Sequence, residues 1–226
     1  MPSLTLTPVT RFRLVNVYLV REDDGLTLVD TAIPGSAKAI LAAAEALGAP
    51  IVRIALTHAH GDHVGSLDAL HAALPEAEVL ISARDARLLA KDKTPEPGEP
   101  GDAKLRGGYP GAATKPTRLL APGDRVGSLE VVAAPGHTPG QLAFLDSRDR
   151  TLIAGDAYTT VGGVATSAKP SFPFPIAALA TWHRPTALQT ARDLRALEPA
   201  RLAVGHGPVV EAPGEQMDAA IARARP

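Results

Sequence analysis

The chain has 226 residues, enough to bury a substantial core as one large domain or two small ones. Its 23 basic and 24 acidic residues give a formal net charge of −1, which leaves no basic excess to attract nucleic acid or anionic lipid, and no run approaches the ~20 apolar residues of a membrane span. There is no cysteine, so disulfides, thiolate ligands and a cysteine nucleophile are excluded, and any metal must be held by histidine and carboxylate.

The first ninety residues predict alternating strands and helices. Two strands joined by a turn at Asp23-Asp24-Gly25 come first, and an alanine-rich helix that stops at Gly48 follows them. This order predicts a mixed α/β layer structure. The expected strands cover residues 11–20, 26–30, 52–57 and 77–82, and the expected helices cover residues 35–47, 65–74 and 83–91.

A dense run of metal-capable side chains follows the third of these strands. Residues 57–63 read Thr-His-Ala-His-Gly-Asp-His and contain His58, His60, Asp62 and His63. Neutral imidazole suits Zn, Fe, Ni or Cu, and a neighbouring carboxylate keeps Zn and Fe prominent. In extended backbone, positions i and i+2 face the same side, so His58 and His60 can bind one ion. The chain then turns at Gly61, which directs the last two donors to a neighbouring position. We therefore expect a metal site rather than a solvated polar loop.

The second half begins after residues 92–117, a stretch rich in proline, glycine and charge that we interpret as a long surface loop over a site rather than a domain linker. Short strands and then helices follow, as in the first half, which predicts two β-rich halves packed as a sandwich with helices outside. The expected strands cover residues 117–120, 129–134, 141–146, 151–154 and 201–204, and the expected helices cover residues 176–197 and the segment from about residue 214.

Three further donors stand directly behind apolar strands of the second half. His137, Asp156 and His206 each have glycine beside them, which allows tight turns and close backbone approach. Functional groups often collect on the loops that a rigid scaffold positions. Each donor is a weak signal alone, but together with the run at 58–63 they form a specific pattern.

With these residues the chain resembles the metallo-β-lactamase superfamily. The match is the His-x-His-x-Asp-His signature at residues 58–63 and the later donors in the family's order, and it extends over essentially the whole chain, including Asp30 and Gly65. The resemblance implies one domain over residues 1–226 with an αββα four-layer sandwich of two mixed sheets and a dinuclear site along one edge. It implies a first metal on His58, His60 and His137, a second on Asp62, His63 and His206, and Asp156 as the bridge.

This ligand set implies a dinuclear metal hydrolase. Two divalent ions ~3.5–4 Å apart lower the pKa of a shared water and stabilise the attacking and leaving oxygens. We expect Zn, with Fe or Mn as alternatives. Asp62 is the expected catalytic residue, because it can both bind metal and orient the hydroxide, whose proton it passes to the leaving group. Replacing His58 or Asp156 by alanine is expected to remove metal and activity together.

Several other residues have two interpretations. Asp30 is either the hydrogen-bond acceptor of a ligand imidazole or a carboxylate in a strand-end turn. His71 and His183 fit surface or partly buried helix positions better than ligand positions, although His183 can also line the cleft.

Substrate contacts are expected from two segments of the second half. Tyr158 follows the bridging aspartate and is a candidate because lactonases of the superfamily use a tyrosine near this point, although their offset differs. Phe172 and Phe174 lie in a stiff, proline-rich stretch that forms either an apolar wall for substrate or a loop packed on the core. Specificity is expected in the loops at 92–117 and 157–175, and either loop can form a lid.

The leading prediction is hydrolysis of a small-molecule ester, thioester or lactone in the glyoxalase II and lactonase-like branch. Against β-lactams stand the missing signal peptide and the presence of Asp156, and the short segment after His206 argues against glutathione. The alternatives are a phosphodiesterase or nuclease, which the charge disfavours, a mononuclear iron persulfide dioxygenase, and a metal-stabilised domain closed to substrate. We expect a cytoplasmic protein with a small-molecule substrate, no nucleic acid and no membrane, as a monomer or a homodimer.

Overall fold

Two six-stranded β-sheets form the centre of the computed structural model, which describes residues 5–225. In the first sheet the three leading strands are antiparallel and the following pairs are parallel. Parallel neighbours need a crossover connection, and each of the three crossovers here carries at least one helix. The strand order is β1 (Leu6–Arg11), β2 (Val15–Glu22), β3 (Gly25–Val29), β4 (Ile51–Ala55), β5 (Glu78–Ser82) and β6 (Arg118–Leu120).

The second sheet is built from the second half of the chain. Most of its neighbours are antiparallel, and β10 pairs in parallel with β13. Its order is β14 (Val210–Glu211), β13 (Arg201–Ala203), β10 (Thr151–Ile153), β9 (Leu142–Asp146), β8 (Leu129–Ala133) and β7 (Arg125–Val126). A separate ribbon pairs β11 (Tyr158–Thr159) with β12 (Ala165–Thr166).

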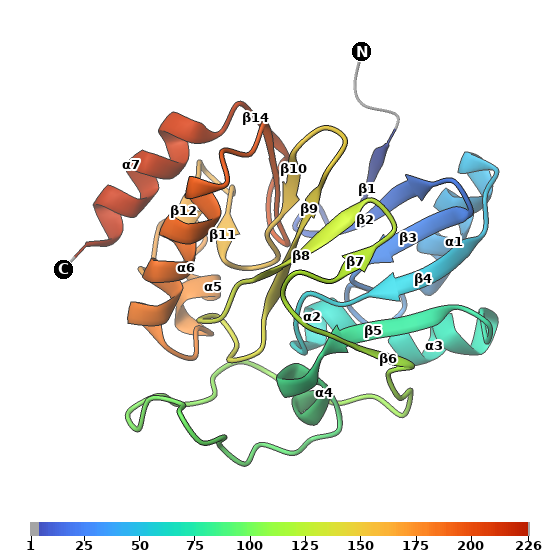
Figure 1. The fold of residues 1–226 in the computed structure, drawn as a ribbon, viewed down its shortest axis with the longest axis horizontal. Coiled ribbons are helices and arrows are strands. Elements are labelled where there is room, and N and C mark those ends of the chain that lie inside the picture. The colour runs from blue at the N-terminus through green and yellow to red at the C-terminus, as the bar shows by residue number, and fades with distance from the viewer. Residues whose placement is uncertain (1–4, 226) are drawn as a thin grey trace.

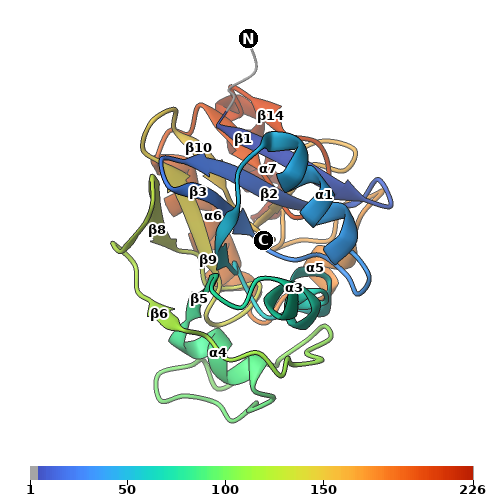
Figure 2. The ribbon, with the colours of Figure 1, turned by 90° about the vertical axis from the view of Figure 1, so that its right-hand side faces the viewer.

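Helices cover the outer face of each sheet. Figure 1 shows α6 and α7 on the left, α1 and α3 on the right, and the sheets between them. Figure 2 shows α1 and α3 in front of the first sheet. The helices are α1 (Ala37–Leu47), α2 (Gly61–Val64), α3 (Leu67–Ala73), α4 (Ala83–Leu89), α5 (Ile176–Leu179), α6 (Arg184–Ala196) and α7 (Gly214–Ala224). This arrangement confirms the predicted four-layer sandwich.

The hydrophobic core has three parts, one at each boundary between layers. Residues such as Leu28 and Ile40 pack the first sheet against α1 and α3. Tyr18 and Phe144 belong to the part between the two sheets. Met217 belongs to the part that joins the second sheet to α6 and α7. Because β2 contributes to both of the first two parts, its central residues are buried on both faces.

The start of the strand expected at residues 11–20 is wrong, because β2 covers residues 15–20 as predicted but residues 11–14 are the end of β1 and the turn of a hairpin. β1 ends at Arg11 and β2 begins at Val15, and the two strands pair in an antiparallel register. The turn places Phe12 and Arg13 in the left-handed region, with φ of 49° and 59°. No glycine, asparagine or proline marks this turn, so the apolar pattern continues through it.

The single helix expected at residues 176–197 is also wrong. α5 ends at Leu179 and α6 starts at Arg184, and His183 between them is extended, with φ −142° and ψ 106°. Pro185 lies in the first turn of α6, where its missing N–H has no cost, but it disfavours a helical residue before it. The other expected elements agree with the structure to within a few residues, whereas β1, the short helix α2 and the short strands β7, β11, β12 and β14 were not predicted.

Residues 90–117 contain no helix or strand, in agreement with the predicted long loop. The loop is held by Asp68, whose carboxylate accepts hydrogen bonds from the backbone N–H groups of Ala113 and Thr114 at 3.0 and 2.8 Å. None of the helices in residues 5–225 has the length and apolar character needed to span a membrane.

Candidate metal centre

The first four donors follow β4 at one edge of the sandwich. After this strand ends at Ala55, residues 56–60 belong to no helix or strand, and His60 is extended, with φ −71° and ψ 151°. The chain then enters α2, a single helical turn that carries Asp62 and His63. The change from extended to helical backbone separates the donors into two pairs, as the turn expected at Gly61 requires.

The other three donors come from the ends of strands in the second sheet. His137 follows β8, Asp156 follows β10 and His206 follows β13. Glycine is required beside the last one, since a Cβ on Gly205 would lie 2.2 Å from Asp156 Oδ1 and 2.6 Å from His63 Cε1. The strand ends of the two sheets therefore bring all seven predicted donors together.

The seven side chains form three linked triplets, within each of which one donor atom per residue lies within 4.8 Å of the others. Asp62 is partly exposed, with 38% of its side chain accessible, and the other six residues are buried. The triplets are His58, His60 and His137; His58, His63 and Asp156; and Asp62, His63 and His206.

Asp156 lies between the two outer triplets. Its Oδ2 is 3.5 Å from Nε2 of His137 and 3.2 Å from Nε2 of His206, and its Oδ1 is 3.3 Å from Nε2 of His63. One carboxylate thus faces donors of both outer triplets, which is the geometry that a bridging ligand needs.

Each of the five imidazoles has its outward ring nitrogen beside a hydrogen-bond acceptor. These contacts orient each ring so that its other nitrogen faces the cluster, where His60 Nδ1 and His137 Nε2 lie 2.9 Å apart. The outward contacts are His58 Nδ1 with Thr57 Oγ1 (2.9 Å), His60 Nε2 with the Arg106 carbonyl (2.9 Å), His63 Nδ1 with Asp30 Oδ2 (2.8 Å), His137 Nδ1 with Thr181 Oγ1 (3.1 Å) and His206 Nδ1 with the Leu14 carbonyl (3.2 Å).

Asp30 supports two of these imidazoles. Besides accepting from His63, its carboxylate accepts hydrogen bonds from the backbone N–H and hydroxyl of Thr57, both at 2.8 Å. The Thr57 hydroxyl is therefore free to accept from His58. Of the two interpretations of Asp30, the structure supports the acceptor for a candidate ligand.

The residues present fit a metal pair. Within residues 5–225, His58 Nε2, His63 Nε2 and Asp156 Oδ1 are buried and make no hydrogen bond. Buried polar atoms without a partner are costly, and a cation coordinated by them would satisfy them. Imidazole nitrogens and carboxylate oxygens are also donors that Zn and Fe accept.

Burial and charge act differently on the two outer triplets. Burial lowers the pKa of His58 well below its usual value and that of His137 to about 3. Burial also acts to lower the pKa of His206, but the charge of Asp156 outweighs it and raises this pKa to about 10. Burial acts to raise the pKa of Asp156, but the nearby His206 and His63 hold it well below the usual range. The first triplet is thus neutral imidazole, and Asp156 is ionised.

A cavity of about 140 Å³ opens onto the cluster. Apart from candidate ligands, its walls are small or apolar, and none of the lining residues is lysine or arginine. These walls are Gly107, Gly108, Ile176, Ala177 and Ala180, from the long loop and from the region of α5. Gly107 is needed here, because its φ is +78° and a Cβ would lie 2.6 Å from His60 Nε2.

The three residues predicted to contact substrate lie in different places. Tyr158 is fully buried beneath α6 and its hydroxyl donates to the Ala191 carbonyl at 2.6 Å, so the structure does not bring it to the cavity. Phe174 is buried and packs on His206, with 4.8 Å between ring centroids. Phe172 is 93% exposed.

The two histidines interpreted as helix residues belong to none of the triplets. His71 is on α3. His183 caps the N-terminus of α6, where its side chain accepts from the backbone N–H of Thr186, and it lines a depression next to the cavity.

Sequence reasoning missed Asp85, which links the two histidine loops. This carboxylate on α4 is fully buried and accepts hydrogen bonds from Ala59 N at 2.8 Å, Thr138 Oγ1 at 2.9 Å and Gly140 N at 2.9 Å. Burial raises its pKa to about 6. Ala59 lies between His58 and His60, and Thr138 follows His137. A lone aspartate in a helix carries no sequence signal for this role.

Comparison with known proteins agrees with this geometry. The model of the metallo-beta-lactamase superfamily matches residues 10–206. The uncharacterized protein YobT of Bacillus subtilis (strain 168) is 48% identical over 212 residues, which cover 93% of this chain and 91% of YobT. The probable metallo-hydrolase YflN of the same organism is 28% identical, over 86% of this chain and 81% of its own length.

More distant relatives include the hydroxyacylglutathione hydrolase of Stenotrophomonas maltophilia (strain R551-3), which is 28% identical over 70% of this chain. The match spans about half of that enzyme, 52% of its length. Among solved structures, TTHA1623 in a di-iron-bound form has a TM-score of 0.68 and 26% identity, over 97% of this chain and 98% of its own.

The B3 metallo-beta-lactamase BLEG-1 also has a TM-score of 0.68, with 23% identity over 94% of this chain and 95% of its own, and it shows the shared fold. The family match covers most of the residues and both sheets. The chain belongs to the metallo-beta-lactamase superfamily.

Proposed function

We propose that the chain is a dinuclear metal hydrolase that cleaves an ester, thioester or lactone bond in a small molecule. The observation that carries the proposal is the set of seven donors in three linked triplets beneath an open cavity. The names of two relatives, the probable metallo-hydrolases YflN and YybB of Bacillus subtilis (strain 168), support a hydrolase. The distant hydroxyacylglutathione hydrolases support the glyoxalase II and lactonase-like branch.

The donor positions support two neighbouring metal sites with one shared ligand. His58, His60 and His137 would hold one ion, Asp62, His63 and His206 the other, and Asp156 would bridge them. When bound, two ions supply a nucleophile at neutral pH and stabilise the charge that develops on the attacked carbonyl. The chain itself contributes fixed ring orientations and a small cavity that holds the reacting group against the donors.

Asp62 is the proposed proton-transfer group. It is the most exposed of the seven donors, it lines the cavity, and its Oδ2 is 3.2 Å from His206 Nε2. A carboxylate in this position can accept a proton from an attacking water and deliver it to the leaving oxygen or sulfur.

A small organic substrate is favoured over nucleic acid. The cavity lacks lysine and arginine among its lining residues, and the net charge of the chain is −1. Nucleic-acid enzymes need cationic surface to bind phosphates. We propose Zn as the resident metal, with iron as the alternative that the di-iron relative suggests.

The test is a substrate screen on protein reconstituted with Zn, and in parallel with Fe or Mn. Lactones, thioesters, aryl esters, β-lactams and bis(p-nitrophenyl) phosphate are compared by kcat/KM at one metal occupancy. We expect lactone, thioester or ester hydrolysis to exceed the others. Preference for the phosphodiester would instead assign a nuclease, and one iron per chain with oxygen consumption on a persulfide would assign a dioxygenase.

A further inference from the structure

The exposed large apolar side chains of this protein gather near the cavity. Five such residues stand out in the described part of the chain, with exposures of 55–93%. Four of them belong to two short segments, residues 12–14 and 172–179, and Leu119 on β6 is the exception. The four, named here the apolar rim, are Phe12, Phe172, Ile176 and Leu179.

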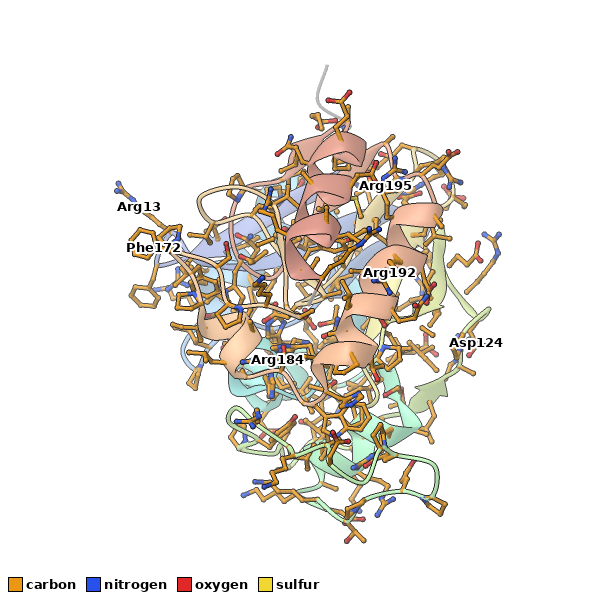
Figure 3. All side chains as sticks on the ribbon, turned by 90° about the vertical axis from the view of Figure 1, so that its left-hand side faces the viewer. Arg13, Asp124, Phe172, Arg184, Arg192 and Arg195 are labelled. Atoms are coloured by element: carbon orange, nitrogen blue, oxygen red, sulfur yellow. The ribbon has the colours of Figure 1, made fainter. Side chains whose placement is uncertain are left out.

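The two segments meet at His206. The carbonyl of Leu14 contacts its Nδ1 at 3.2 Å, and the ring of Phe174 packs on its ring. Ile176 lines the cavity directly. In Figure 3, Phe172 and Arg13, the neighbour of Phe12, project from the same edge of the molecule. The apolar rim therefore joins the mouth of the metal cavity through Ile176, and Leu179 follows on the same short helix α5.

The cavity itself is too small for a whole substrate. Its volume of about 140 Å³ is below the roughly 300–1,000 Å³ of pockets that enclose small ligands. A carbonyl group and its immediate neighbours can enter, and the remainder must lie outside the cavity. A larger hollow of about 630 Å³ shares Asp62 and Gly108 with the cavity, but none of the five strongly exposed apolar side chains lines it, whereas Ile176 of the rim lines the cavity itself. Exposed apolar surface at a site is a signature of ligand binding, because it is otherwise costly to leave in water.

We propose that the substrate is an acyl compound with an unbranched aliphatic chain, which lies across the apolar rim while the acyl carbonyl enters the metal cavity. This inference rests on the proposed hydrolase function and names its substrate class. Beyond Leu179 the surface becomes polar, since Asp102, Arg106 and Arg184 line the adjoining depression. The apolar rim therefore ends at Leu179, which predicts that the aliphatic chain of the substrate is of medium length.

The test is a chain-length series of acyl thioesters or esters with four to twelve carbons. In the wild type, kcat/KM should rise about twofold for each added methylene, as expected for a chain that buries part of its surface, and then level off. In Leu179→Ser and Phe172→Ser the slope of log kcat/KM against chain length should decrease.

Leu119→Ser is the matched control. Leu119 and Leu179 are the same residue with the same 55% exposure, but Leu119 lies on β6 and does not line the cavity or the depression beside it. The control should keep the wild-type slope. A flat series in the wild type, or equal slopes in Leu179→Ser and Leu119→Ser, would overturn the proposal.

A binding measurement separates this inference from the hydrolase itself. Butanoate, hexanoate, octanoate and decanoate are titrated into the Zn-loaded protein by calorimetry, which needs no turnover. Affinity should increase with length in the wild type and less so in Leu179→Ser. If the longer carboxylates bind more tightly while no ester, thioester or lactone is cleaved, the proposed hydrolase function is wrong and chain binding at the rim is supported. If affinity is independent of chain length, the rim does not bind the chain.

Discussion

At the scale of single residues, the histidines of the candidate centre are oriented by their hydrogen-bond partners. Five outward ring nitrogens meet five different acceptors, two of which are main-chain carbonyls. A backbone carbonyl cannot rotate away as a side chain can, so the rings of His60 and His206 are held by the fold. This leaves Asp156 as the donor whose loss should disturb both outer triplets.

We expect Asp156→Asn to lose more than about 100-fold in metal affinity, beyond the 10–100-fold typical of residues that only support a ligand. Elemental analysis after dialysis should find clearly fewer than two ions per chain. Asp146→Asn is the control. Asp146, at the end of β9, is also 3% exposed, but its carboxylate pairs with Arg148 and not with a candidate metal ligand. Two ions retained in Asp156→Asn would disprove the bridging role.

The donors could be predicted from sequence because they stand in one dense run and behind three apolar strands with glycine. Their partners could not. Thr181 lies 44 residues from His137, and the Arg106 carbonyl has no side-chain identity to recognise. Asp30 was visible as a strand-end carboxylate, yet its two interpretations differ only by the neighbour it meets, which needs the fold.

At the scale of elements, the strands and helices that were predicted correctly have strong periodic patterns and clear stop signals. α1 ends at Gly48, whose φ is 68°, as the pattern indicated. The hairpin turn at Phe12 has no local signal and depends on tertiary contacts, whereas the break before α6 has a local signal in Pro185 and is reinforced by such contacts. Val15 pairs with His206, and the N–H groups of Trp182 and His183 bond to His137 and Gly136, so both irregular segments are held by the candidate centre itself.

We expect Asp85→Asn to weaken the first triplet in particular. Ala59 N and Gly140 N donate to different oxygens of Asp85, so the NH₂ group of asparagine would face one of these two N–H groups and that hydrogen bond would be lost, at a cost of ~1–3 kcal/mol in unfolding free energy. The affinity for the ion at the first triplet should fall about 10–100-fold, measured by competition with a chelating dye.

Asp68→Asn is the matched control for this variant. Asp68 also accepts two loop N–H groups, from Ala113 and Thr114, but it is exposed and is part of none of the triplets. It should keep both metal affinities. Equal metal affinities in Asp85→Asn and the wild type would show that Asp85 serves only stability.

At the scale of the whole molecule, every triplet takes donors from both halves of the chain. The four donors at residues 58–63 belong to the first sheet, and His137, Asp156 and His206 belong to the second. Cross-sheet backbone bonds accompany them, from Asn16 N to the Gly205 carbonyl at 2.8 Å and from Leu142 N to the Thr57 carbonyl at 2.9 Å. Bound ions would therefore crosslink the two sheets.

We expect metal removal to lower the thermal stability. An ion present at 1,000 times its Kd adds about 4 kcal/mol, and for a domain of this size 1 kcal/mol corresponds to about 2–4 °C in Tm. Chelation should thus lower Tm by roughly 10 °C, measured by calorimetry, and added Zn should restore it. Asp156→Asn should show a smaller drop, and an unchanged Tm in the wild type would argue against a crosslinking metal.

The fixed outward contacts of the five imidazoles have a consequence for how the protein acquires its ions. Because these contacts come from the protein itself, the orientation of the imidazoles does not depend on which divalent ion binds. The choice is then left to the intrinsic preference of nitrogen and oxygen donors, which runs from Mn through Fe to Zn and Cu, and to the concentration of each ion where the chain folds. The metal ion bound would then depend on which ions are available while the chain folds, and the same sequence would carry different metals in different growth conditions.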